Sequence, residues 1–194
     1  MTVLMGLKKY DPEKTWFTSD THFYHEWVIR CGLRDFPDVE TMNETIIRNW
    51  NRVVGPDHTV FHLGDFAFTT DKYVTQIIRR LNGNIRLIYG NHEIEHFSVM
   101  FNKHFSSRRF QECIRLGRYK VFLNHLPLLC FPLKPHYIQL YGHVHSKPGR
   151  ELTEDQKKLV HLLPTQYEVG MDLHDLTPVS GVRILEHFDR MDIG

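Results

Sequence analysis

An α/β fold, built from parallel strands and intervening helices, is the class that this sequence predicts. Apolar runs typical of strands flank an amphipathic helical pattern over residues 59–89, which is the order of a strand–helix–strand unit with parallel pairing. Beyond residue 108 a glycine-centred pattern predicts a hairpin, so a second, antiparallel region is expected. With 194 residues, 41% of them hydrophobic, the chain can bury a sizeable core, and we expect one domain over residues 1–194.

Elements in the first half of the chain are predicted from side-chain periodicity. β-Branched and aromatic runs predict strands, and apolar residues at helical spacing predict helices, one of them with Asp38 as its N-cap. In chain order we expect a strand at Thr15–Ser19, a short helix or loop after His22, a helix at Asp38–Val54, a strand at Thr59–Leu63, a helix at Asp71–Leu81 and a strand at Ile85–Tyr89.

Turn residues set most of the boundaries in the second half. Gly117 marks the hairpin turn, while Thr177 and Pro178 suit the cap and the first position of a C-terminal helix. In chain order we expect a helix at Ile94–Phe105, hairpin strands at Arg108–Leu116 and Tyr119–Leu123, a strand at Tyr137–Tyr141, a charged segment at Arg150–Leu163, a strand at Gln166–Gly170 and the C-terminal helix.

Charge and cysteine content narrow the function classes. The formal net charge of +1 gives no global field that would recruit nucleic acid or a membrane, which leaves only a local basic patch for such partners. Three widely spaced cysteines, Cys31, Cys113 and Cys130, predict reduced thiols in a cytoplasmic setting. Met1–Asp11 lacks the apolar core of a signal peptide, and no run approaches the ~20 apolar residues that cross a bilayer. We therefore expect a cytoplasmic protein that does not engage a membrane.

Polar residues that can bind metal follow five of the predicted strands. At the first strand end Asp20 and His22 are two residues apart, and on an extended backbone such residues point to the same side. Glycine, which permits close backbone approach, directly precedes three of the clusters. Ligands of open α/β sheets lie beyond the carboxyl ends of the strands, so the clusters are expected to share one rim. They are Asp20-x-His22, Gly64-Asp65, Gly90-Asn91-His92-Glu93, Asn124-His125 and Gly142-His143-x-His145.

These clusters hold more candidate ligands than one metal ion needs. Two aspartates, one asparagine and five histidines exceed the set of a four-coordinate zinc with an open position. They suit two ions that share a ligand, an arrangement that holds both the attacking and the leaving oxygen of a displacement at phosphorus. Carboxylate, amide and imidazole admit several metals, and we expect manganese first, with nickel, iron, zinc and magnesium as alternatives.

Taken in order, the five clusters resemble those of the calcineurin-like metallophosphoesterase superfamily, including small bacterial and phage-type members, over residues 16–145. The resemblance implies a four-layer αββα sandwich with two mixed β-sheets and a dimetal centre at their shared edge. It also implies roles. Asp20, His22 and His145 would bind the first metal ion, Asn91, His125 and His143 the second, Asp65 would bridge both, and His92 would lie near the leaving oxygen with Glu93 orienting it.

The same resemblance implies a metal-dependent phosphoester hydrolase in which a metal-bridging hydroxide is the nucleophile, His92 the general acid and Asp65 the second catalytic residue. The chain has no long insertion, which favours an open site and a phosphodiesterase acting on small nucleotide-like or phosphodiester substrates. Asn91, His92 and His25 are the expected substrate-binding residues. A phosphomonoesterase and a nuclease are the alternatives, the latter without support from the net charge. A non-catalytic scaffold is disfavoured by the complete ligand set, and a metal-sensing or storage protein by the presence of His92.

Other residues near the clusters have ordinary structural interpretations. His62, inside a predicted strand, is expected to be a packed structural histidine. Asp172 could close the rim of the site, but a turn is its expected role. Arg34 is expected at the surface, and Asn43 to be solvated or a capping group. Histidines without strand-end context are expected at the surface or in structural roles: His96, His104, His136, His161, His174 and His187. Four aromatic residues can pack in the core or form a pocket wall that stacks on a base: Phe23, Tyr24, Phe66 and Phe68.

Overall fold

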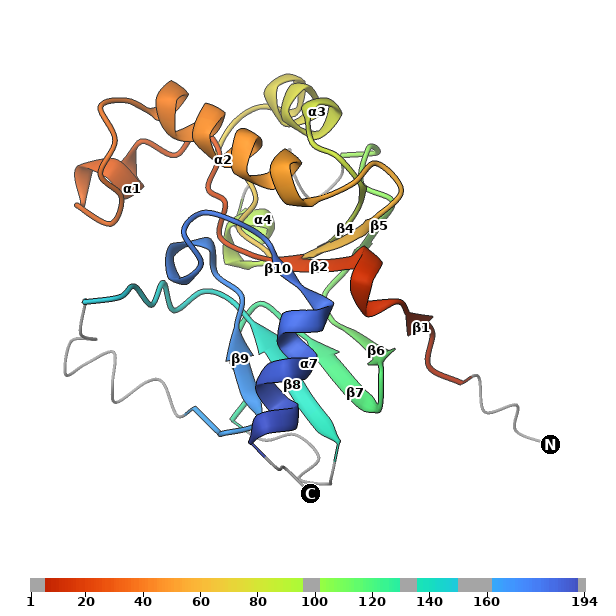
Figure 1. The fold of residues 1–194 in the computed structure, drawn as a ribbon. Helices are drawn as coiled ribbons and strands as arrows, with labels where there is room; N and C mark the ends of the chain where they lie inside the picture. Colours follow the sequence, from red (N-terminus) through yellow and green to blue (C-terminus); the bar gives the residue numbers. More distant parts are fainter. Residues whose placement is uncertain (1–5, 96–101, 130–135, 150–161, 192–194) are drawn as a thin grey trace.

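The structure is a computed structural model that describes residues 6–95, 102–129, 136–149 and 162–191 (Figure 1). Two five-stranded β-sheets are stacked between helices (Figure 1). Helices α2 (Val39–Val53) and α3 (Asp71–Arg80) lie above the first sheet, and α7 (Gly181–Arg190) lies alongside the second. Each sheet contains both parallel and antiparallel neighbours. The predicted αββα sandwich with two mixed sheets is therefore confirmed. His96, Cys130, His161 and nearly all of the charged segment expected at 150–163 lie outside the described residues.

The first sheet has the strand order β10-β2-β3-β4-β5. Its strands are β2 (Thr15–Thr18), β3 (Thr59–His62), β4 (Asn84–Ile88), β5 (Ser107–Arg109) and β10 (Val179–Ser180). The strands from β2 to β5 are parallel, and β10 pairs antiparallel with β2. The parallel strand–helix–strand unit predicted for residues 59–89 is confirmed, and it brings the carboxyl ends of β2, β3 and β4 to one edge.

The second sheet has the strand order β1-β6-β7-β8-β9. Its strands are β1 (Lys9–Tyr10), β6 (Glu112–Leu116), β7 (Tyr119–Leu123), β8 (Tyr137–Tyr141) and β9 (Gln166–Glu168). The hairpin of β6 and β7 turns at Gly117, as predicted, whereas β7, β8 and β9 are parallel. The prediction of one strand over Arg108–Leu116 is wrong, because the chain crosses from β5 in the first sheet to β6 in the second.

Local capping explains where the helices begin. The helices are α1 (Trp27–Arg30), α2 (Val39–Val53), α3 (Asp71–Arg80), α4 (Asn91–Glu95) and α7 (Gly181–Arg190), with 3-10 turns η1 (Pro12–Lys14) and η2 (Met171–Leu173). The Asp38 carboxylate caps α2 by accepting a backbone hydrogen bond at 2.6 Å, as predicted. Ser180 caps α7, so the prediction of Thr177 as cap is wrong. Val179 instead pairs with Phe17 of β2, which delays the helix.

The helix predicted over Ile94–Phe105 is confirmed only at its start, where Ile94 and Glu95 belong to α4. It is wrong over residues 102–105, which are not helical. Asn102 is buried there, and its side-chain amide donates hydrogen bonds to Asp71 and Thr75 of α3. These bonds tie the segment to the helix in a way that its apolar spacing does not reveal.

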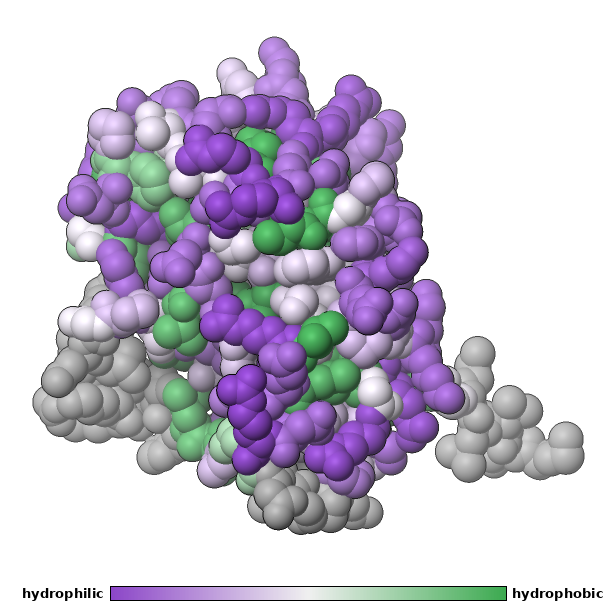
Figure 2. Space-filling view, in the orientation of Figure 1, coloured by the Kyte–Doolittle hydropathy of each residue, from purple (hydrophilic) through white to green (hydrophobic). Residues whose placement is uncertain are grey.

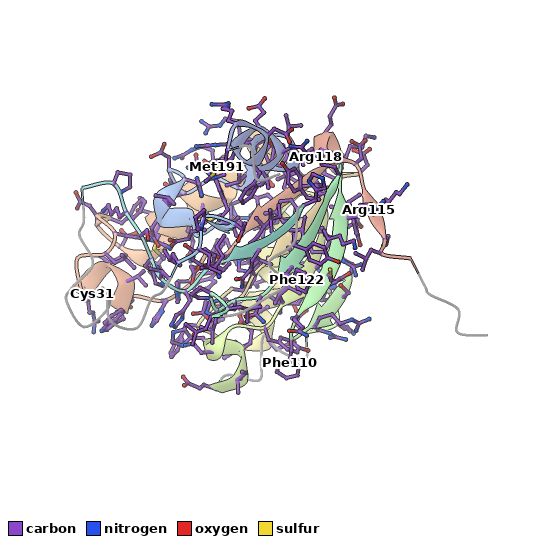
Figure 3. All side chains as sticks on the ribbon, turned by 90° about the horizontal axis from the view of Figure 1, so that it is seen from below. Cys31, Phe110, Arg115, Arg118, Phe122 and Met191 are labelled. Carbon is purple, nitrogen blue, oxygen red and sulfur yellow. The ribbon has the colours of Figure 1, made fainter. Side chains whose placement is uncertain are left out.

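Two hydrophobic clusters form the core. One lies between the first sheet and helices α2 and α3 and contains the fully buried Trp50. The other lies between the sheets and joins Phe17 of β2 to Phe188 of α7. Each such large side chain contributes about 1.5–3 kcal/mol by its burial. Hydrophilic residues cover most of the face in Figure 2, and Figure 3 shows Arg115 and Phe122 over the strands of the second sheet.

Two observations concern membrane-spanning helices and the state of the cysteines. No helix among the described residues is long and apolar enough to cross a membrane. Cys31 and Cys113 carry free thiols, as expected from their wide spacing.

Candidate metal centre

The polar strand ends adopt a left-handed backbone. Asp20, His22, Asp65, His143 and His145 have φ angles of 58°, 48°, 57°, 70° and 54°. Residues other than glycine rarely adopt such angles, and each costs about 1–3 kcal/mol unless the surrounding structure imposes it. The expectation that Asp20 and His22 converge along an extended strand is therefore wrong in its geometry. They converge because both backbones turn left-handed just beyond β2.

A first candidate metal group consists of Asp20, His22 and His145, whose ligand atoms all lie within 4.8 Å of one another. The Nε2 atom of His145 lies 3.6 Å from Asp20 Oδ1 and 3.2 Å from His22 Nε2. The group joins the end of β2 in the first sheet to the end of β8 in the second. An isolated parallel bridge between Ser19 and Gly170 connects the sheets at this same edge.

A second candidate group consists of Asp65, His125 and His143, again with ligand atoms within 4.8 Å of one another. Asn91 lies beside them, with its Oδ1 atom 3.1 Å from His125 Nε2. The Nδ1–H of His125 donates to the Leu63 carbonyl at 2.7 Å, which turns Nε2 toward Asp65. Fixing one imidazole nitrogen in this way is how metal-binding histidines are usually oriented.

Asp65 lies between the two groups. Its Oδ2 atom is 3.8 Å from His22 Nε2 in the first group and 3.5 Å from His125 Nε2 in the second. One carboxylate close to both groups is the arrangement of a ligand shared by two ions. The structure thus brings together all seven residues predicted as metal ligands: Asp20, His22, Asp65, Asn91, His125, His143 and His145.

The residues present fit a dinuclear centre. The Oδ1 atom of Asp20 is buried and has no hydrogen-bond partner among the described residues, which is costly for a carboxylate unless a cation lies against it. The glycines before the clusters leave room for the ligands. A Cβ atom on any of them would lie less than 3.0 Å from a candidate ligand: Gly64 from His125, Gly90 from Asp65 and Gly142 from Asp20.

Charge and burial act in opposite directions on the imidazoles. Burial lowers the pKa of His22 well below its usual value, and it lowers the pKa of His143 as well. Burial also opposes protonation of His125, but its hydrogen bond to Asp65 and the charges of Asp20 and Asp65 together outweigh burial and raise the pKa of His125 to about 9. Because a metal ion binds the unprotonated ring, it would displace the proton on His125 and meet His22 and His143 already neutral.

Two further histidines lie on the open side of the groups. The backbone N–H of His92 donates to Asp65 Oδ1 at 3.1 Å, and its Nε2 lies 3.8 Å from Asp65 Oδ2, with 26% of the side chain exposed. The Nδ1 atom of His25 lies 3.0 Å from His22 Nδ1, and burial lowers the pKa of His25 to about 4. His25 therefore lies beside the first group, and the ligand atoms of His22, His25 and His92 all lie within 4.8 Å of one another.

Glu93 has a different position from the one expected. It is buried, and its carboxylate accepts hydrogen bonds from the backbone N–H groups of Asp65, Phe66 and Gly90 rather than orienting His92. Burial and the nearby charge of Asp65 raise the pKa of Glu93 to about 7. The side chain therefore organises the backbone around Asp65.

Sequence reasoning missed two buried residues beside the site. Arg34, expected at the surface, and Asp172, expected in a turn, form an ion pair with side chains that are each 2% exposed. Asp172 also lies 2.8 Å from the Nδ1 atom of His145. The one signal in the sequence was that Asp172 shortly follows a predicted strand end, as the ligands do.

The other residues singled out in the sequence lie either in the core or at the edge of the site. His62 is fully buried, as predicted for a structural histidine. Asn43 is also buried, contrary to expectation, and its Oδ1 atom accepts a hydrogen bond from Tyr24 N at 3.1 Å. Phe23 and Phe66 belong to the core, whereas Phe68 is partly exposed and stacks on His25 with ring centroids 4.4 Å apart.

Comparison with known proteins decides the family. The family model of calcineurin-like phosphoesterases matches residues 13–178. The chain belongs to this family. It is therefore a metal-dependent phosphoesterase, and its described residues include His and Asp groups that could hold a metal.

The phosphoesterase has relatives among archaeal, phage and bacterial proteins. An uncharacterized protein of Methanocaldococcus jannaschii is 34% identical over 135 residues, covering 69% of this chain and 70% of that protein. The Gene 66 protein of Mycobacterium phage L5 is 38% identical over 86 residues, covering 42% of this chain and only 41% of its own length. A crystal structure of a protein of unknown function from Aquifex aeolicus has a TM-score of 0.66 at 24% identity, covering 89% of this chain and 97% of that one. The last likeness shows the shared fold.

Proposed function

We propose that this phosphoesterase hydrolyses phosphodiesters in small nucleotide-like substrates, with two divalent metal ions, manganese first among them. The position of Asp65 Oδ2, within 3.8 Å of His22 Nε2 and 3.5 Å of His125 Nε2, carries the proposal. Asp20, His22 and His145 are assigned to the first ion, Asn91, His125 and His143 to the second, and Asp65 to both.

Each nearby side chain has a separate task in this proposal. When bound, two divalent ions lower the pKa of water from about 15.7 toward neutrality and neutralise charge on the phosphoryl oxygens. Asp65 is kept in one orientation by the His92 N–H that donates to its Oδ1 atom at 3.1 Å. The His92 ring, partly exposed beside Asp65, donates a proton to the leaving oxygen as general acid. Asn91 contributes to both the metal and the substrate.

The preference for a nucleotide-like substrate is supported by the open side of the site. Phe68 is 37% exposed, and its ring is nearly parallel to that of His25, at an angle of 7°. Its centroid also lies 5.7 Å from that of His92, in an edge-on arrangement. Aromatic faces beside the reacting phosphate can stack on a planar base. His25 is accordingly assigned to substrate binding together with His92.

A substrate panel tests this function. Aryl mono- and diesters, cyclic nucleotides, dinucleotides and single-stranded DNA are incubated with manganese, nickel, magnesium and zinc. We expect metal-dependent cleavage of diesters and dinucleotides, and none by the Asp65→Asn variant. Cleavage of monoesters alone would identify the protein as a phosphomonoesterase. A strong preference for DNA would identify it as a nuclease. No turnover with any metal would overturn the proposal in favour of a non-catalytic scaffold.

A further inference from the structure

A buried ion pair lies directly behind the first candidate metal group. The Arg34 guanidinium donates to both carboxylate oxygens of Asp172, at 2.8 Å from Nε to Oδ1 and 3.1 Å from Nη2 to Oδ2. Arg34 follows α1, and Asp172 lies in η2, 138 residues further along the chain. Removing two charges from water costs about as much as their pairing returns, so a buried pair is weak evidence for a stabilising role. Its contacts point to another one.

Asp172 sets the direction of the His145 ring. Its Oδ2 atom lies 2.8 Å from His145 Nδ1, and an ionised carboxylate only accepts hydrogen bonds, so Nδ1 carries a proton. The Arg34 guanidinium donates to both carboxylate oxygens of Asp172, which favours the ionised carboxylate that acts only as an acceptor toward His145. With Nδ1 protonated, the neutral ring presents the lone pair of Nε2 to the Asp20 side.

Arg34 also holds the turn that carries the other two members of the group. Its Nη1 atom donates to the Thr21 carbonyl at 2.7 Å, and Nη2 donates to the Asp20 carbonyl. These carbonyls belong to the turn in which Asp20 and His22 adopt left-handed backbones. One guanidinium therefore fixes two candidate ligands through the backbone and the third through Asp172.

The second candidate group is held by other contacts. His125 donates to the Leu63 carbonyl, and Glu93 holds the backbone of Asp65. Among the hydrogen bonds of the described residues, none joins Arg34 or Asp172 to Asn91, His125 or His143. The ion pair is thus specific to one half of the centre.

We propose that Arg34 and Asp172 are positioning residues for the first metal ion, which fix the tautomer of His145 and the turn of Asp20 and His22. The proposal rests on the dinuclear centre proposed above. The ion pair of Arg34 and Asp172 should raise the metal affinity of the first site and leave that of the second site unchanged. A general contribution to folding would not distinguish the two sites.

Calorimetric titration of the metal-free protein with manganese tests the assignment. In Asp172→Asn the amide can donate as well as accept, so the proton on His145 Nδ1 is no longer imposed. We expect first-site affinity to fall about 10–100-fold while the second site keeps its affinity. The His145→Ala and His143→Ala variants identify which binding event belongs to which site. Asp175→Asn, at an exposed carboxylate three residues further on, is the matched control and should bind like the wild type.

The outcomes separate this inference from the function on which it rests. If the wild type binds fewer than two ions, the dinuclear centre itself fails. If the wild type binds two ions and Asp172→Asn binds both unchanged, or loses both equally, only the positioning role is overturned. The Arg34→Lys variant should also bind metal more weakly at the first site. A lysine lacks the planar guanidinium that reaches Asp172 and the Asp20 and Thr21 carbonyls together.

A measurement on the wild type covers the case in which the variants do not fold. Nitrogen-15 correlation spectra of the zinc-loaded wild type report which ring nitrogen of His145 carries the proton, with the ring assigned through the backbone resonances of His145. A proton on Nδ1 supports the proposal, and a proton on Nε2 overturns it.

Discussion

The Glu93 carboxylate accepts a hydrogen bond at 2.8 Å from the backbone N–H of Asp65, 28 residues earlier in the chain. It also accepts from Phe66 N at 2.7 Å and from Gly90 N at 2.6 Å. One buried side chain thus ties the loop after β3 to the loop after β4. The left-handed conformation of Asp65 is imposed from outside its own segment, through contacts that include Glu93.

Glu93→Gln should destabilise the metal-free protein by about 3 kcal/mol, because an amide has one oxygen for three N–H donors and its own NH₂ faces them. Urea unfolding of wild type and variant measures the difference. Glu95→Gln, at an exposed residue of the same helix, is the control and should stay within about 0.5 kcal/mol. Equal midpoints for Glu93→Gln and wild type would show that these bonds do not hold the loops.

Asp65→Asn should lose more metal than His22→Ala, because Asp65 is close to both candidate groups and His22 belongs to one. Metal content per chain, measured on the purified proteins after dialysis, is the readout. The exposed Asp57→Asn is the control for loss of a carboxylate. Equal occupancy in Asp65→Asn and His22→Ala would count against a shared ligand.

His92→Ala should retain its metal and lose turnover by about 10²–10⁴-fold on diesters with poor leaving groups. The loss should be small on aryl esters, whose leaving oxygen needs no proton. The backbone hydrogen bond to Asp65 survives in this variant, so the metal content serves as an internal control. Unchanged turnover on alkyl diesters would remove His92 from the role of general acid.

His62 should make the protein less stable in acid. Burial lowers the pKa of His62 from 6.5 to about 3, so between these values the unfolded chain binds a proton that the folded protein excludes. Stability from this group is complete above pH 6.5 and falls as the pH drops, by up to about 1.4 kcal/mol per unit. His62→Gln should flatten the decline between pH 6.5 and pH 5 by about 1.5 kcal/mol. Parallel stability curves for the two proteins would contradict this.

Elements with a strong local pattern were predictable. Helix α2 combines a capping Asp38 with apolar residues at helical spacing, and both signals act within a few residues. The same holds for β3, where a short apolar run stops at Gly64. Thr177 and Pro178 gave an equally good local signal for a helix start, but pairing of Val179 with Phe17 prevailed. That pairing spans most of the chain, and no short window contains it.

The sequence by itself determined the α/β class, since periodicity is a local property, and the resemblance of its short motifs to a known family identified the seven candidate ligands. Only the tertiary structure decided how these ligands converge. Arg34 donates to the Asp20 and Thr21 carbonyls in the left-handed turn that carries Asp20 and His22, and it meets Asp172 across 138 residues. Such contacts depend on how the two stacked sheets pack against each other, and packing is a property of the whole folded chain.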